Sequence, residues 1–379
     1  MTLIIQALRK ARGFYRTILR QMYLWWGGRL VSILHKNKKH KEEYPIDFVV
    51  TWVDGNDPDW RREKQKYAGQ ITDRAANAEA RYRDWETLVY WFRAVEKYAP
   101  WVNHVYFVTC GQKPSWLNLN NEKLRFVTHE EFIPKEYLPT FSCPPIELNL
   151  WRIPGLSEHF VYFNDDMFLN RPVRPEDFFQ NGLPLECAIA KPLYVADDGN
   201  IPWQRSLLND YAVINSSFNI RQCIRSHPSK WFSYVIGSDA KYNRRLYYDG
   251  YVVGMVHPHS SRAFLKKTYE DLWSKKVEVM DRTSRSKFRD NNGVTNQLVA
   301  LWMIFSGDFY PIKRRDLEDM YVISTKTIQS AINALNASQH YVLCLNDGEK
   351  TESSEFENLK QSILEALAKK FPDKSSFEL

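Results

Sequence analysis

The chain has 379 residues, of which 44% are apolar and 26% are charged, so wholesale disorder is excluded and two packed lobes or one enlarged domain are expected. The net charge of +7 is concentrated near the N-terminus, because residues 1–41 contain ten Lys or Arg and no acid, and this distribution excludes a uniformly basic nucleic-acid-binding protein. The five cysteines are scattered without a CxxC pair, which argues against a zinc site or a disulfide framework and favours a reducing compartment.

Residues 1–43 are predicted to form a basic N-terminal tail. Apolar side chains recur in it at spacings of three, four or seven residues with arginines between them, a pattern typical of an amphipathic helix. Its charge-free stretches are too short to span a bilayer, and arginines interrupt any signal-peptide core. We expect the helix to lie on an anionic membrane surface. Docking on the protein's own body is the alternative, and no nucleic acid is expected as a partner.

The apolar, β-branched run at 46–53 is predicted to be a buried strand, and the turn residues that follow it include Asp54, Gly55 and Asp57. In an open α/β sheet, ligands bind beyond the carboxyl ends of the strands. We therefore expect Asp54 and Gly55 to contact the substrate, the glycine letting the backbone approach a phosphate. An ordinary Asp-Gly loop is the alternative.

A second α/β unit is predicted after a charged connection. An apolar stripe with helical spacing ends at Pro100, and strands are expected at 104–109 and 124–129. This order of elements favours an α/β fold with a Rossmann-like, mostly parallel sheet. Arg81 and Arg83 precede the predicted helix and are candidate phosphate clamps, with surface ion pairs as the alternative.

The strongest chemical signal in the chain is a pair of adjacent acids. A strand predicted at 159–163 is followed by Asn164, Asp165 and Asp166. Two adjacent carboxylates after a buried strand repel each other unless a cation or a phosphate-bound metal neutralises them. Oxygen ligands of this kind suit Mg²⁺ or Mn²⁺. The alternative is that one aspartate caps the next turn and the other is solvated.

Residues 181–250 carry scattered aromatic side chains and are predicted to form a helical insertion subdomain on the acceptor side of the site, with plain core packing as the alternative. A strand is expected at 251–256, running into His257 and His259. Two histidines at a strand end, followed by basic residues, favour a site that binds an anion. Arg289 precedes a predicted helix, and its guanidinium can bind a phosphate through two parallel hydrogen bonds. An ion pair that caps the helix is the alternative.

A last predicted strand, at 341–345, leads to another acidic turn that contains Asp347. An amphipathic helix is expected at 352–371, before a charged tail. The catalytic core is therefore predicted in two halves, 44–180 and 251–350.

The chain resembles the Stealth family in four blocks that occur in the family's order. They span residues 46–55, 81–168, 257–297 and 341–348, and the second contains Leu-Pro-Thr-Phe and Phe-Asn-Asp-Asp elements. The family comprises bacterial capsule and exopolysaccharide hexose-1-phosphate transferases, together with the eukaryotic GlcNAc-1-phosphotransferase. The resemblance implies transfer of a hexose or HexNAc 1-phosphate from a UDP-sugar donor to an oligosaccharide or lipid-linked saccharide acceptor, with a phosphodiester formed and UMP released. Together with the basic tail, it implies a place in the bacterial cytoplasm, peripheral on the inner face of the cell membrane.

The resemblance also implies roles for individual side chains. The family's catalytic acids fall on Glu147 and Asp166, and its third-block histidine falls on His259, although His257 fits the local pattern nearly as well. Arg289 completes the expected catalytic set, in which Glu147 or His259 is the general base. The other expected site residues are the substrate-binding Asp54, Gly55, Arg81, Arg83, Asn164 and His257 and the metal ligands Asp165, Asp166 and Asp347.

Two other functions compete with this hypothesis. A metal-dependent glycosyltransferase would use the same acids but release UDP, and a membrane-associated scaffold of polysaccharide assembly would have no activity. The sequence contains no P-loop, GxSxG or HExxH motif and no GxGxxG followed by an acidic residue. Nucleoside triphosphatases, serine hydrolases, zinc proteases and dinucleotide oxidoreductases are therefore unsupported.

Overall fold

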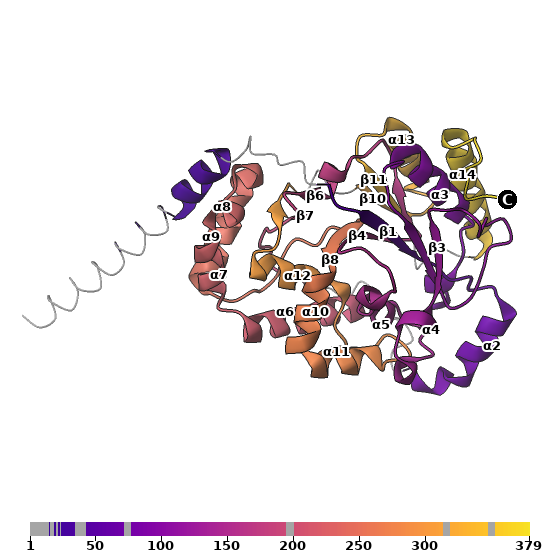
Figure 1. Ribbon diagram of the computed structural model, residues 1–379, viewed down its shortest axis with the longest axis horizontal. Coiled ribbons are helices and arrows are strands. Elements are labelled where there is room, and N and C mark those ends of the chain that lie inside the picture. The colour runs from indigo at the N-terminus through magenta and orange to yellow at the C-terminus, as the bar shows by residue number, and fades with distance from the viewer. Residues whose placement is uncertain are drawn as a thin grey trace, which may run out of the picture.

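The computed structural model describes residues 15, 19, 22, 24–34, 43–71, 77–194, 201–313, 319–347 and 353–379. Its centre is a five-stranded sheet in the order β3-β2-β1-β4-β8 (Figure 1). The first four strands along the chain run parallel to one another, and β8 is antiparallel at one edge. The predicted α/β fold with a mostly parallel sheet is confirmed. The strands are β1 (Ile46–Thr51), β2 (Val105–Thr109), β3 (Leu124–Thr128), β4 (His159–Asn164) and β8 (Arg262–Leu265).

Helices cover both faces of this sheet and build a helical subdomain beside it. The longer helices are α2 (Pro58–Lys66), α3 (Leu88–Tyr98), α6 (Ile201–Ser217), α7 (Ile220–Ser226), α9 (Ala240–Asp249), α10 (Lys266–Lys275), α11 (Val277–Ser284), α12 (Asn296–Ser306), α13 (Ile328–Ala337) and α14 (Ser353–Lys370). Short helical segments include η3 (Glu79–Tyr82), α4 (His129–Phe132), α5 (Cys143–Glu147), η5 (Leu150–Arg152), α8 (Pro228–Trp231) and η7 (Tyr234–Asp239).

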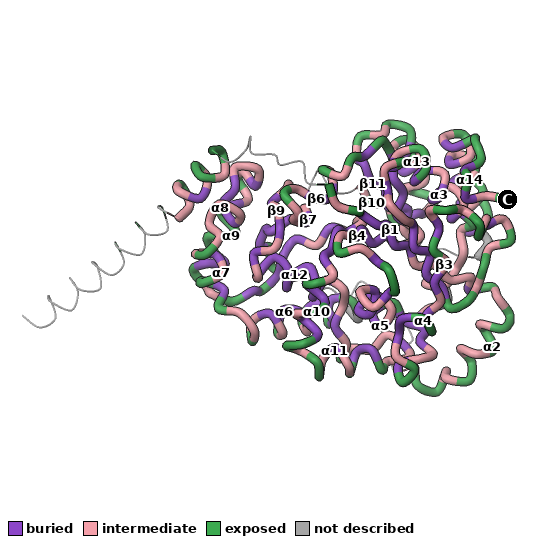
Figure 2. Tube along the Cα trace, viewed as in Figure 1, coloured by how far each residue is buried: buried purple, intermediate pink, exposed green. Residues whose placement is uncertain are grey.

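Alternate side chains of the sheet face two separate hydrophobic cores. Phe48 and Val50 of β1 pack into the core that α3, α13 and α14 cover, whereas Val49 packs into the core that α6, α10 and α12 cover. Side chains of a strand alternate between its two faces, so a sheet with helices on both sides is apolar on both. Figure 2 shows the result, with buried strands at the centre and a largely exposed α2 at the periphery.

Two small sheets complete the fold. One brings β5, which follows β4 after a two-residue turn, against β11, and so places the last predicted block beside the carboxyl end of β4. In it β10 and β11 run parallel and β5 is antiparallel to β11. The strands of the two sheets are β5 (Met167–Leu169), β10 (Asp319–Ile323) and β11 (Val342–Asp347), and β6 (Phe179–Gln180), β7 (Leu183–Glu186) and β9 (Tyr310–Pro311).

The strand predicted at 251–256 is wrong. This segment makes an isolated bridge between Met255 and Ala190 and otherwise runs irregularly through the helical subdomain. Gly254 has φ +156°, and a Cβ atom there would lie 2.1 Å from the carbonyl oxygen of Lys191. Two backbones are therefore in close contact here, and Val252, Met255 and Val256 are buried without a sheet while Tyr251 and Val253 are exposed.

The helices predicted within 181–250 are present as α6 to α9, on the side of the molecule away from α13 and α14 (Figure 1). Most of the predicted tail, by contrast, lies outside the described residues. Residues 24–34 form a helix that lies beside α8 (Figure 1). Among the helices in the described part of the chain, none is long and apolar enough to cross a membrane.

Candidate active site

The carboxyl end of β4 presents the two adjacent acids. The turn that carries them is fixed against β11, because the backbone N–H of Leu345 donates to the carbonyl oxygen of Asp166 at 2.9 Å. The Asp166 carboxylate accepts a hydrogen bond from Asn346 Nδ2 at 2.9 Å and one from Cys344 Sγ at 3.3 Å. His259 Nε2 lies 3.8 Å from the same carboxylate oxygen, Oδ2. Three side chains from two other segments of the chain therefore meet at Asp166.

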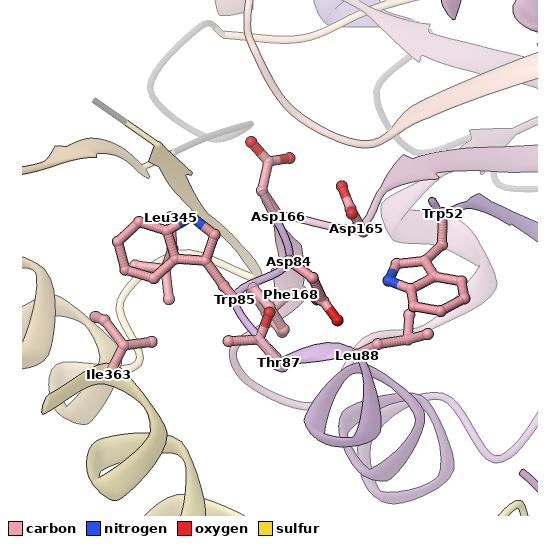
Figure 3. Close-up of a pocket in the computed structure, with 10 residues that line it drawn as sticks. All are labelled: Trp52, Asp84, Trp85, Thr87, Leu88, Asp165, Asp166, Phe168, Leu345 and Ile363. Carbon is pink, nitrogen blue, oxygen red and sulfur yellow. The ribbon is translucent and has the colours of Figure 1, made fainter. Parts of the chain in front are cut away.

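The two acids differ in how readily they ionise. Burial raises the pKa of Asp165 to about 8, and the charges of Asp166 and Asp84 add to the rise. Burial also opposes ionisation of Asp166, but the contact with His259 and the hydrogen bonds from Asn346 and Cys344 together outweigh it, and the pKa of Asp166 is lowered. Figure 3 shows Asp165 and Asp166 turned to the same side of their loop and Asp84 turned the other way. Asp166 is therefore the acid that carries a negative charge near neutral pH.

Asp166, His259 and Cys344 form a group that could hold a metal ion. One possible ligand atom from each lies within 4.8 Å of the others. The Oδ1 atom of Asp166 is buried and has no hydrogen-bond partner in the described part of the chain, so it is available to a cation. The nitrogen and sulfur donors of this set suit a transition metal better than Mg²⁺, which prefers oxygen. Of the three predicted metal ligands, Asp166 belongs to this group.

Arg83 and Asp347, predicted as a phosphate clamp and a metal ligand, are paired with each other. Arg83 Nε and Nη2 donate to the two oxygens of Asp347, both at 2.9 Å. The side chains are 18% and 16% exposed, so this bidentate pair is largely shielded from water. It joins the segment before α3 to the end of β11, and both residues also line the cleft described below.

Glu147 is the last residue of α5, a short helix with Pro144 and Pro145 in its first turn. Its side chain is buried and accepts a hydrogen bond from Tyr162 Oη at 3.1 Å. Burial raises the pKa of Glu147, and the positive charge of Arg289 opposes the rise. Tyr162 of β4 therefore positions this carboxyl group, and the charge of Arg289 acts on it.

The two predicted histidines have different surroundings. His257 is packed among helices, where its ring contacts the hydroxyl of Tyr211, and burial with the nearby charge of Arg262 lowers its pKa to about 3. His259 is 42% exposed and lies against Asp166. The two positions therefore differ in geometry: His259, to which the resemblance assigned the catalytic histidine, lies against Asp166, whereas His257 contacts Tyr211.

A cleft of about 1510 Å³ brings most of the predicted residues together. It runs between the carboxyl end of the sheet and the helical subdomain, where residues 235–239 form part of its wall. Arg289 lines it from a loop that Asn77 fixes, with hydrogen bonds of 3.1 and 3.2 Å to the Arg289 backbone. The predicted residues that line the cleft are Arg81, Arg83, Glu147, Asn164, Asp165, Asp166, His257, His259, Arg289 and Asp347.

Asp54 and Gly55 are not among the residues that line this cleft. Asp54 accepts a hydrogen bond from the Asn56 backbone at 2.8 Å, and the Gln112 side chain bridges its backbone N–H and carbonyl groups. A Cβ atom at Gly55 would lie 1.9 Å from the carbonyl oxygen of Tyr82. The glycine thus permits close packing of the turn against η3, and substrate contact by this turn stays a prediction.

The sequence reasoning missed Cys344 and Asn346. Both lie in β11, where residues two apart point to the same face. Cys344 and Asn346 therefore point together toward Asp166, while Asp347 points to Arg83 on the opposite face. The period-two rule, applied to the last predicted block, would have found them.

The fold and cleft are those of an α/β enzyme whose site combines carboxylates with cationic groups. Two family models match the chain. The model of "Stealth protein CR1, conserved region 1" matches residues 44–72, and that of "Stealth protein CR2, conserved region 2" matches residues 81–185. The first two blocks of the predicted resemblance are thereby confirmed. The chain belongs to the Stealth family and is an enzyme of the phosphotransferase class.

Similarity to characterised relatives extends over nearly the whole chain. The sequence is 41% identical to the capsular polysaccharide phosphotransferase WcwK of Streptococcus pneumoniae, with 88% of this chain and 98% of the relative covered. It is 40% identical to the receptor polysaccharide phosphotransferase WefC of Streptococcus gordonii, over 88% of this chain and 99% of the relative. It is 36% identical to the exopolysaccharide phosphotransferase cps2G of Lactiplantibacillus plantarum, over 88% of this chain and 96% of the relative.

Proposed function

We propose that this enzyme transfers a hexose or HexNAc 1-phosphate from a UDP-sugar to a hydroxyl of a saccharide acceptor during synthesis of a capsular polysaccharide or exopolysaccharide. The observation that carries the proposal is the convergence of Glu147, Asp166, His259 and Arg289 on one large cleft. Phosphoryl transfer needs groups that position the phosphate and neutralise its charge, and these residues supply them. The printed names of the relatives support the polysaccharide part of the proposal.

The proposed reaction is an in-line displacement at the sugar-linked phosphorus. The acceptor hydroxyl oxygen attacks that phosphorus, the bond from phosphorus to the bridging oxygen breaks, and UMP leaves with the bridging oxygen. Arg289 lines the cleft, where its guanidinium can hold phosphate oxygens. The proton of the attacking hydroxyl moves to Glu147 or to His259.

A divalent cation fits this site. Asp166, His259 and Cys344 would hold it, and the ion would neutralise charge on the phosphate oxygens. Asp165 lies beside this group and its raised pKa keeps it largely protonated at neutral pH, so its predicted role as a ligand requires loss of that proton. Mg²⁺ and Mn²⁺ are the proposed ions, with Mn²⁺ favoured by the donor set.

Removal of the metal is the first test. We expect excess EDTA to abolish turnover and added Mn²⁺ or Mg²⁺ to restore it, because the charge of the transferred group would otherwise be uncompensated. Cys344→Ala should raise the Mn²⁺ concentration needed for half-maximal activity by about tenfold. Cys187→Ala is the matched control, since both thiols are fully buried. Unimpaired turnover in excess EDTA would show that the reaction needs no divalent ion.

The nucleotide product tests the reaction type. We expect UMP to accumulate as acceptor is consumed, and the saccharide product to contain a phosphodiester detectable by phosphorus NMR. Chromatography of the spent nucleotide distinguishes this outcome from the glycosyltransferase alternative, which leaves UDP. Release of UDP alone would refute the proposal.

Peripheral attachment to the inner face of the bacterial cell membrane, with the body of the enzyme in the cytoplasm, also belongs to the proposal. The support is the basic sequence of residues 1–41.

A further inference from the structure

The helix formed by residues 24–34 has one face fixed to the helical subdomain. Leu24 and Trp25 pack against the hydrophobic core of that subdomain. The Arg244 guanidinium lies 4.8 Å from the Trp25 ring, and Ser32 Oγ accepts a hydrogen bond from the Tyr234 backbone at 3.0 Å. This inner face is a specific docking surface with apolar, cation–π and hydrogen-bonding contacts.

Gly28 permits the close approach of the helix to α8 on the inner face. A Cβ atom at this position would lie 2.4 Å from the carbonyl oxygen of Pro228 at the start of α8. The neighbouring Gly27 differs, because a Cβ atom there would have nothing within 4 Å. Gly28 therefore lies on the docked face of the helix, and Gly27 lies outside that face.

The outer face of the same helix carries an exposed apolar stripe. Its members lie three or four residues apart, the spacing of one helical face, and each is between 48% and 67% exposed. Single exposed apolar residues are ordinary on protein surfaces, but a continuous row of them indicates an interaction surface. Within residues 24–34 the stripe consists of Trp26, Leu30 and Ile33, and the exposed Tyr15, Leu19 and Met22 continue its spacing along the sequence.

The charge around the stripe favours a lipid surface as its occupant. Residues 1–41 contain ten basic residues and no acid, and α9 beside the helix adds the exposed Lys241 and Arg244. Tryptophan and leucine beside arginine and lysine match the headgroup region of an anionic bilayer. A second copy of the chain would instead bring two strongly positive segments together, and like charges oppose that contact.

We propose that this helix is a two-faced membrane arm, with the outer stripe inserted in the headgroup region of an anionic bilayer and the inner face fixed to the wall of the cleft. The membrane and the protein body need not be alternative sites for the tail, because the inner face of the helix is docked while its outer stripe stays exposed. Tyr234, which bonds Ser32, begins η7, and residues 235–239 of η7 line the cleft. The arm thus holds the cleft at a fixed distance from the bilayer. That a lipid-linked acceptor reaches the cleft by this route rests on the proposed function.

Vesicle flotation tests the outer face. The full-length enzyme should float with vesicles of phosphatidylcholine and phosphatidylglycerol and float less at high salt, because screening weakens the charge contribution. The double variant Leu30→Gln, Ile33→Gln should lower the partition coefficient by about tenfold or more, since two apolar side chains no longer enter the headgroup region. The double variant Leu119→Gln, Val277→Gln is the matched control, because both of its positions are exposed apolar residues outside the helix.

Two results would overturn the outer-face assignment. One is a full-length enzyme that does not float with anionic vesicles, and the other is a stripe variant that floats as well as the control. Size-exclusion chromatography identifies a second copy as the occupant, if the wild type elutes as a dimer without lipid and the stripe variant as a monomer. Flotation does not depend on turnover, so these outcomes are independent of whether the proposed reaction is correct.

The adjacent glycines test the inner face. Alanine favours a helix over glycine by about 1 kcal/mol at either position, so any loss specific to one of them reports on docking. Gly28→Ala should release the arm and speed its removal by limited proteolysis several-fold, while Gly27→Ala should leave the rate unchanged or lower it. Both variants should still float, because their outer stripe is intact. Equal proteolysis of the two variants would show that the arm is not fixed to the body.

Discussion

Asp166→Asn is expected to lower the rate of sugar-phosphate transfer by about 10³-fold or more, because it removes the ionised carboxylate at the centre of the site. Asp166 is the acid whose pKa is lowered, and it is the carboxylate of the group that could hold a metal. An amide offers one oxygen but no charge, so it would hold a cation poorly. The measurement is turnover of the purified variant on a UDP-sugar donor under saturating Mn²⁺.

The same variant should keep its fold. The carbonyl oxygen of residue 166 still accepts from Leu345, and the amide oxygen can still accept from Asn346. Loss of the charge also relieves repulsion with Asp165. Asp271→Asn, an acid on α10 that pairs with Lys275, serves as the control and should retain activity. Near wild-type turnover by the Asp166 variant would remove this residue from the catalytic set.

The central sheet could be predicted because each strand is a short apolar run bounded by turn residues. The segment at 46–53 and its two parallel neighbours in the sheet carry apolar side chains on both faces, as a buried parallel sheet requires. The acids after β4 were predictable for the same reason, since the carboxyl ends of parallel strands share one edge. The strand predicted from the similar run at 251–256 is wrong, because Val252, Met255 and Val256 pack in the core of the helical subdomain, and such packing leaves the same apolar pattern as burial in a sheet.

Partners that are distant in the sequence could not be predicted. Arg83 and Asp347 were each given a chemical role from local pattern, and only the fold shows that they bind each other. The need for a glycine at position 55 could not be predicted either, because the backbone that it accommodates belongs to Tyr82. Local sequence indicates which side chains can do chemistry, whereas the pairing of those side chains depends on how β5 and β11 come together.

The structure also narrows the choice of general base. His259 lies against Asp166 in the group that could hold a metal, and a coordinated imidazole is not free to take a proton. Glu147 lies outside that group, accepts a hydrogen bond from Tyr162, and has a raised pKa because it is buried. A carboxylate whose pKa is raised toward the working pH is a stronger base than an ordinary one. We therefore expect Glu147 to remove the proton of the acceptor hydroxyl.

Glu147→Gln should reduce kcat by about 10²–10⁴-fold, the usual contribution of general base catalysis, without loss of the folded structure. The wild-type kcat should rise with pH, because Glu147 must lose its proton to act, and the raised pKa places this rise above the range of an exposed glutamate. The rise should disappear from the residual activity of Glu147→Gln and persist in His259→Asn, which weakens metal binding but leaves Glu147 in place. If the rise instead persists in Glu147→Gln and disappears in His259→Asn, His259 is the base.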